Sequence, residues 1–265
     1  MSYKNTLVLE ELRKQSEKVY FRSSFCFLNA HRSWRPSRSH LLIAPPGAGK
    51  TTLLRTLIAD VASNVGKKIA VYLSEETVED FWTEISYSNM PQELIDSVYP
   101  ISESDLTDKT ARGIFLALSE HVDSVGADII FIDNVTTMKC YGESFKNQSY
   151  VTECIKALAI KKRLPVLTVA HTGAQIKESY QGLIDMNDIR GSKDIVNQSE
   201  FLYILQPLYI GNTRKTFISI KKHRGQPVKN NLFQLFYFES VKLFAKDEPR
   251  NFEEFKEIFK ERNKL

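Results

Sequence analysis

The chain has 265 residues, of which 42% are hydrophobic and 26% charged, and this balance excludes a chain that is disordered throughout. Its formal net charge of +4 is too small to indicate nucleic-acid binding by itself. The cysteines, Cys26, Cys140 and Cys154, are odd in number and show no C-x-x-C spacing, which argues against a disulfide framework and a structural zinc site.

The N-terminal segment lacks the features of a targeting signal. It mixes charged and apolar residues from the start, and no apolar run approaches the roughly 20 residues that span a bilayer. We therefore expect a cytoplasmic protein without membrane contact. Residues 7–20 predict a helix outside the main core, and residues 31–39 predict a polar, proline-containing connection.

From residue 40 onward, short apolar runs alternate with amphipathic stretches. The predicted strands are His40–Ala44, Ile69–Ser74, Asp128–Asp133 and Pro165–His171. The predicted helices are 51–63, 77–88, 110–123 and 149–162. This alternation predicts an α/β fold with a mostly parallel, twisted sheet flanked by helices.

Beyond residue 200 the pattern changes. Three strand-like runs, FLYILQPLYI, TFISIKK and NLFQLFYFE, follow one another with no helix between them, which predicts an antiparallel extension of the same sheet. Residues 251–265 predict a charged helix. The simplest division is an N-terminal helical arm over 1–35, a candidate subunit linker, followed by one domain over 36–245 and a C-terminal helix over 246–265.

Residues 44–51, APPGAGKT, fit the phosphate-loop pattern G-x-x-x-x-G-K-[ST], except that Ala44 replaces the first glycine. In such a loop, backbone N–H groups surround a phosphate, and Gly47 and Gly49 permit its close approach. Lys50 reaches the β- and γ-phosphates, and the hydroxyl of Thr51 completes the Mg²⁺ shell. Because the pattern follows an apolar strand and opens a helix, it predicts binding of ATP with Mg²⁺. The predicted nucleotide-binding residues are Pro46, Gly47, Ala48, Gly49, Lys50, Thr51 and Thr52.

Two further carboxylates are needed beside this loop. Asp133 ends the run ADIIFID, and we expect its strand to neighbour the loop strand and its carboxylate to hold the Mg²⁺ through water. Another carboxylate must orient the attacking water. Asn134 occupies the place after Asp133 where some subclasses carry a glutamate, which leaves Glu75 and Glu76 of IAVYLSEET as candidates.

With these residues the sequence resembles the RecA-like ATPases, particularly the hexameric replicative helicases of the DnaB and plasmid RepA kind. The phosphate loop, YLSEET, VLTVAHTG and FISIKKHRGQP carry the resemblance. It implies a RecA-like core in which Glu75 is the catalytic carboxylate and His171 senses the γ-phosphate. It further implies that Lys222 and Arg224 cross a subunit boundary and stabilise charge at the neighbour's γ-phosphate.

The resemblance also implies a homo-oligomeric ring, a hexamer in that family, with single-stranded DNA as its partner. Two connections, 135–148 and 172–189, lie where such rings grip DNA. Cations that bind the backbone and aromatic rings that stack on bases are the usual arrangement for this contact. The candidate contacts are Lys139, Lys146, Lys177 and Arg190, with Tyr180 as a stacking ring.

The leading hypothesis is therefore an ATP-driven motor on single-stranded DNA, a small helicase in the replication of a plasmid, phage or other mobile element. Two alternatives stay open. A RecA- or RadA-like recombination or strand-annealing factor would coat DNA as a filament. A KaiC-like regulatory ATPase would switch a protein partner and hydrolyse ATP slowly, whether or not nucleic acid is present.

Overall fold

The fold is known from a computed structural model that describes most of the chain. The described residues are 22–29, 34–63, 66–87, 90–142, 144–173, 184–189, 191, 193–210, 213–224, 228 and 232–250. Within this part of the chain, no helix is both long and apolar enough to cross a membrane.

A single sheet of nine strands organises the described residues, in the order β3-β2-β4-β5-β1-β6-β7-β8-β9. The strands are β1 (Ser39–Ala44), β2 (Ile69–Leu73), β3 (Val98–Ser102), β4 (Ile129–Asp133), β5 (Val166–His171), β6 (Phe201–Ile210), β7 (Thr213–His223), β8 (Leu232–Phe238) and β9 (Leu243–Arg250). Strands β1 to β6 pair in parallel, and β7, β8 and β9 continue the sheet in antiparallel pairs. The predicted fold class, a mostly parallel sheet with an antiparallel C-terminal extension, is confirmed.

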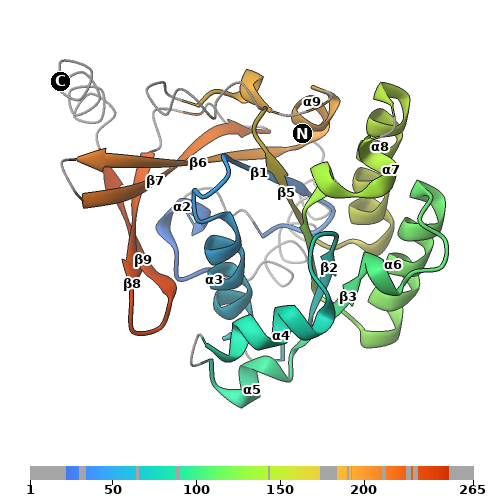
Figure 1. The fold of residues 1–265 in the computed structure, drawn as a ribbon, viewed down its shortest axis with the longest axis horizontal. Coiled ribbons are helices and arrows are strands. Elements are labelled where there is room, and N and C mark those ends of the chain that lie inside the picture. The colour runs from blue at the N-terminus through green and yellow to red at the C-terminus, as the bar shows by residue number, and fades with distance from the viewer. Residues whose placement is uncertain are drawn as a thin grey trace, which may run out of the picture.

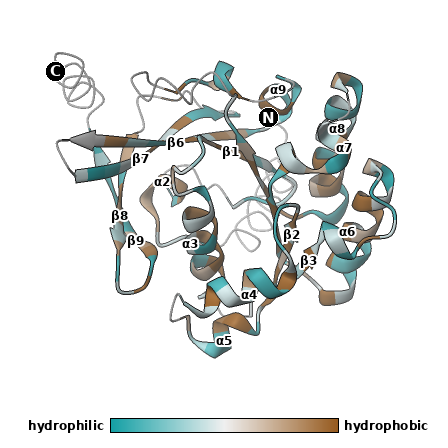
Figure 2. Cartoon of the chain, in the orientation of Figure 1, coloured by the Kyte–Doolittle hydropathy of each residue, from teal (hydrophilic) through white to brown (hydrophobic). Residues whose placement is uncertain are grey.

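Helices cover both faces of the parallel part of the sheet (Figure 1). They are α2 (Cys26–Asn29), α3 (Lys50–Ala62), α4 (Val78–Ser86), α5 (Gln92–Ile95), α6 (Ala111–Val125), α7 (Lys139–Gly142), α8 (Phe145–Lys162) and α9 (Asp194–Gln198). Alternate side chains along the parallel strands pack into two hydrophobic cores, one on each face of the sheet. In β1, Leu42 packs on the side of α2 and α3, whereas Leu41 and Ile43 pack on the side of α6 and α8. Strands buried on both faces are apolar almost throughout, as the colouring of Figure 2 shows.

Two strands were not predicted. The run VYPIS of β3 is short and contains Pro100, so its sequence is a weak strand signal, yet it pairs with β2 at the edge of the sheet. Strand β9 crosses the division expected between residues 245 and 246. The predicted C-terminal helix is therefore wrong over 246–250, because these residues pair with β8. Residues 251–265 lie outside the described part of the chain.

The end of the expected N-terminal arm belongs to the main domain. The backbone amides of Cys26 and Phe27 donate to the two carboxylate oxygens of Asp247 in β9, at 2.6 and 2.7 Å. The ring of Phe27 packs edge-on against Tyr203 of β6. Trp34, in the connection expected to be polar, is 1% exposed. The boundary at residue 35 is therefore corrected toward the N-terminus, while the helix predicted over 7–20 lies outside the described residues.

The connection expected over 135–148 is largely helical. It contains a 3₁₀ turn at Val135–Thr137, helix α7 and the first turn of α8. The side chain of Asn134 caps the 3₁₀ turn, and that of Ser144 caps α8. These caps explain why residues without a clear apolar period form helical turns here.

Candidate nucleotide site

The phosphate loop connects the end of β1 to the start of α3. Gly47 and Gly49 have φ of 72° and 93°, left-handed values that only glycine adopts without strain. Ala44, by contrast, lies within β1, where it pairs with His171 of β5 and is fully buried. The alanine that departs from the sequence pattern therefore sits in extended strand backbone, where a glycine is not required.

Lys50, the first residue of α3, joins the ends of three other strands. Its ammonium lies 3.5 Å from Oδ1 of Asp133 at the end of β4, 4.0 Å from Oε2 of Glu75 after β2, and 3.2 Å from Nε2 of His171 at the end of β5. The Lys50 side chain is only 7% exposed, and a cation so buried requires such partners. The structure thus brings together four residues that the sequence predicted as site residues.

Strand β4 does not neighbour the loop strand, contrary to expectation. Strand β5 lies between β4 and β1, so its terminal residue, His171, lies beside both Lys50 and Glu75. In this position the imidazole can contact whatever group Lys50 binds. The geometry therefore places His171 next to the position expected for a γ-phosphate.

Asp133 has the surroundings expected of a magnesium-binding carboxylate. It is 7% exposed, and burial raises its pKa while the charge of Lys50 lowers it. Its buried Oδ1 faces the ammonium of Lys50 at 3.5 Å, so it becomes available to a metal-bound water when Lys50 turns to a phosphate. Mg²⁺ is held by one or two protein oxygens together with substrate phosphates, so Asp133 and the Thr51 hydroxyl fit the ion.

Glu75 is fixed in the ionised form. Its Oε1 lies 3.0 Å from Nε2 of His171 and 2.6 Å from the side-chain amide of Asn134. The hydrogen bond from His171, with further help from the charge of Lys50 and from Asn134, lowers the pKa of Glu75 to about 2. Glu76, the other candidate, instead points to Arg55, 3.3 Å away. Of these two glutamates, Glu75 is the one that lies beside Lys50 of the phosphate loop.

Asn134 and Arg214 contact this site but were not predicted as part of it. The amide of Asn134 reaches Glu75, and its backbone exchanges two hydrogen bonds with the hydroxyl of Ser74, which ties the ends of β2 and β4 together. Arg214 donates to the carbonyl of Gly47 at 2.8 Å. Strand β6 leaves β1 after Ile204, so the β6–β7 hairpin overhangs the loop and carries Arg214 to it. The position of Asn134 directly after Asp133 could have indicated that it belongs to the site. No feature of the sequence indicated that Arg214 does.

Lys222 and Arg224 lie at the opposite end of the sheet. Lys222 pairs with Leu202, which is level with Leu41 near the start of β1. Its ammonium donates to the carbonyls of Val196 and Asn197 in the last turn of α9. The guanidinium of Arg224 pairs with Glu200 at 3.2 Å and is 65% exposed. Neither cation reaches the phosphate loop of its own chain.

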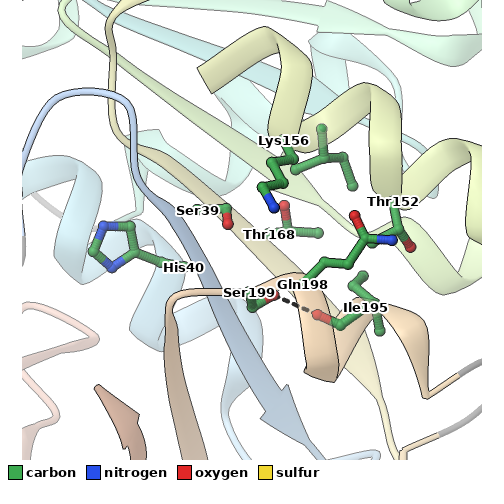
Figure 3. A pocket seen from close by; sticks show the side chains of 9 residues that line it. Ser39, His40, Thr152, Lys156, Thr168, Ile195, Gln198 and Ser199 are labelled. Atoms are coloured by element: carbon green, nitrogen blue, oxygen red, sulfur yellow. Dashed lines mark hydrogen bonds between the residues drawn. The ribbon is translucent and has the colours of Figure 1, made fainter. Parts of the chain in front are cut away.

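A small cavity lies at this end of the sheet, and Figure 3 shows the side chains that line it. Its volume is about 10 Å³, enough for one water at most. Buried hydroxyls of Ser39 and Thr168 line it without partners among the described residues. Beside it, burial lowers the pKa of His40 to about 3, so this imidazole is neutral and stacks on Phe201. We interpret this region as core.

The predicted DNA contacts are only partly described. Lys139 begins α7 and Lys146 lies in the first turn of α8, and both side chains are exposed. Lys177, Tyr180 and Arg190 lie outside the described residues.

Comparison with known proteins agrees with this arrangement. Residues 30–175, more than half of the chain, match the model of the AAA domain family. The chain belongs to the AAA domain family. No curated protein matches the sequence of this AAA domain. A KaiC-like protein from the hyperthermophilic archaeon Pyrococcus horikoshii OT3 has a similar structure, with a TM-score of 0.68 and 12% identity over 87% of this chain and 99% of the other.

The family and the fold agree on the class of protein. This AAA domain is a P-loop ATPase with a RecA-like fold. The family implies a nucleotide ligand and, in general, Mg²⁺. At 12% identity the structural likeness establishes the fold alone.

Proposed function

We propose that this AAA domain is an ATP-driven motor on single-stranded DNA, a small ring-forming helicase of the DnaB and RepA kind. The observation that carries the proposal is the position of Lys222 and Arg224. They stand at the end of the sheet remote from their own phosphate loop, and Arg224 is largely exposed. Cations placed in this way are too far from their own phosphate loop to act there, and they are available to the site of a neighbouring subunit.

Within one subunit, the residues around the loop divide the work of hydrolysis. Lys50 turns from Asp133, Glu75 and His171 to the β- and γ-phosphates when ATP binds. Asp133 and Thr51 would hold Mg²⁺, which supplies charge neutralisation at the phosphates. Glu75, ionised and fixed by Asn134, orients the attacking water.

The neighbouring subunit would complete the site. Arg224, released from Glu200, and Lys222 would approach the γ-phosphate and stabilise the charge that develops in the transition state. An arginine supplied in this manner raises turnover by about 10³–10⁵-fold in other P-loop NTPases. Hydrolysis then depends on assembly, as a ring motor requires.

The test of the motor assignment is turnover and unwinding in the same preparation. We expect single-stranded DNA to raise ATP turnover several-fold and the assembled protein to unwind a forked duplex. Stable filaments on DNA without unwinding would instead favour a recombination factor. Turnover and assembly that ignore DNA altogether would contradict both and favour a regulatory switch.

A further inference from the structure

A second cavity lies on the face covered by α6, α7 and α8. Its volume is about 530 Å³, within the range of ligand-binding pockets. The first turns of three helices line it. The side chains that can contact a ligand there are Lys109, Arg112, Lys139, Asn147 and Tyr150. We refer to it as the basic pocket.

The charge of the basic pocket is unbalanced. Lys109 and Arg112 lie at the start of α6 and Lys139 at the start of α7, and no carboxylate lines the cavity. Among the described residues, none of the three forms an ion pair; Lys109 reaches only the carbonyl of Ser104, at 3.5 Å. Asp108 lies near enough to Arg112 to offset part of its charge, but it does not line the cavity, and its carboxylate also accepts a hydrogen bond from the amide of Thr110. Three cations around one cavity repel each other, and an anionic ligand removes that repulsion.

The other side chains indicate what kind of anion fits. Tyr150 is 46% exposed at the edge of the cavity, where its ring can stack on a planar group. Asn147 supplies an amide that both donates and accepts hydrogen bonds. Cations with a neighbouring exposed aromatic ring are the combination that binds single-stranded nucleic acid, through its phosphates and its bases.

The basic pocket is joined to the nucleotide site by a short, well-fixed segment. Lys139 follows Asp133 by six positions, and the turn between them is capped by Asn134, which contacts Glu75. The amide of Lys139 donates to Glu103 at 3.2 Å, and the hydroxyl of Tyr72 in β2 donates to the other oxygen of that carboxylate at 2.8 Å. A ligand held by Lys139 is therefore connected to the two strands that carry Glu75 and Asp133.

We propose that the basic pocket binds single-stranded DNA, with Lys109, Arg112 and Lys139 on the phosphodiester backbone and Tyr150 stacked on a base. The proposal rests on the proposed function and adds to it a defined place where the strand is held. Lys109, Arg112 and Tyr150 are contacts that the loop sequences gave no reason to expect.

The experiment measures binding of a fluorescently labelled oligothymidylate to the full chain by anisotropy, over a series of salt concentrations. We expect Arg112→Glu and Lys139→Glu each to weaken binding by at least about tenfold, and each lost phosphate contact to reduce the log–log salt slope by about 0.7. Tyr150→Ala should weaken binding by about tenfold and leave the slope unchanged, since stacking carries no charge.

The matched control is Lys161→Glu, the same charge reversal at an exposed lysine in the last turn of α8, far along the helix from the pocket. It should bind DNA with nearly wild-type affinity. Thermal unfolding of each variant shows whether it is folded. If one of the two charge-reversal variants does not fold, the other still tests the pocket. Pocket variants that bind as tightly as the wild type would overturn the pocket while leaving the proposed motor intact. A wild-type protein that binds no single-stranded DNA would overturn both.

Discussion

Glu75 receives two hydrogen bonds on one oxygen, from His171 and from Asn134. Both favour the ionised carboxylate, as does the ammonium of Lys50, 4.0 Å from its other oxygen. A carboxylate with a pKa of about 2 is a weak base, so its role at neutral pH is to orient water by accepting a hydrogen bond. These contacts also link the stability of the fold to pH.

The first prediction concerns His171→Ala. Without the imidazole, we expect the pKa of Glu75 to rise from about 2 toward its ordinary value of 4.5. Since the folded-state pKa is depressed, the stabilisation from ionised Glu75 is present above about pH 4.5 and is lost as pH falls toward 2. The substitution should therefore lower stability above about pH 4.5, and the stabilities of the two proteins should converge as pH falls toward 2. Carbon NMR of the Glu75 carboxyl measures the pKa directly, with His121→Ala as a control, because His121 bonds to the distant carbonyl of Tyr99. An unchanged pKa would show that His171 has no such effect.

The second prediction concerns Arg214. Its hydrogen bond to the carbonyl of Gly47 holds the outside of the phosphate loop. A hydrogen bond from a charged donor at an exposed site is worth about 1 kcal/mol, so Arg214→Ala should weaken ATP binding by about fivefold. Calorimetric titration with a non-hydrolysable ATP analogue measures this, and Lys215→Ala at the next position of β7 is the control. Equal affinities for both variants would mean that the loop holds its shape without Arg214.

At the scale of elements, the turn from β1 into α3 requires glycine at position 49 because of its backbone conformation rather than because of steric crowding. A Cβ at Gly49 would meet atoms of Arg214 and Phe244 at 3.5 and 3.7 Å, which are ordinary contacts. The obstacle is the φ of 93°, which costs an L-residue roughly 1–2 kcal/mol.

The third prediction is therefore that Gly49→Ala destabilises the fold by roughly 1–2 kcal/mol and impairs ATP binding through the altered loop. Gly142→Ala provides the matched control. It adds the same methyl group where nothing lies within 4 Å and φ is not left-handed. Urea unfolding and nucleotide titration of the two variants give the comparison. A Gly49→Ala protein as stable as Gly142→Ala would contradict the conformational explanation.

The elements that could be predicted from the sequence are those with a local signal. Apolar runs defined β1, β2, β4 and β5 almost to the residue, and the site residues at their ends followed because parallel strands finish at one edge. Strand β9 mixes charged residues with Pro249, and only its pairing with β8 makes it a strand. Arg214 joins the site through the overhang of β6 and β7 beyond β1, a matter of long-range register that no local pattern records.

At the scale of the whole molecule, the proposed motor would have each chain carry half of two different sites. The phosphate loop, Glu75 and Asp133 lie at the carboxyl ends of the parallel strands. Lys222 and Arg224 lie at the opposite end of the sheet, level with the start of β1. A head-to-tail arrangement of subunits would bring these ends together, and such heterologous contacts close into rings or extend as filaments. Arg38 and Arg224 share the carboxylate of Glu200, so Arg224 can leave it without stranding a buried charge.

The central claim, a hydrolytic site shared between subunits, is tested most directly by mixing two inactive variants. Arg224→Ala and Glu75→Gln should each bind ATP and lack turnover. In an equal mixture, about one quarter of the interfaces combine an intact Glu75 with an intact Arg224 from the neighbour. We predict that ATP turnover of the mixture rises clearly above that of either variant, toward about a quarter of the wild-type rate. A mixture as inactive as its components, with assembly verified by sizing, would contradict the shared site.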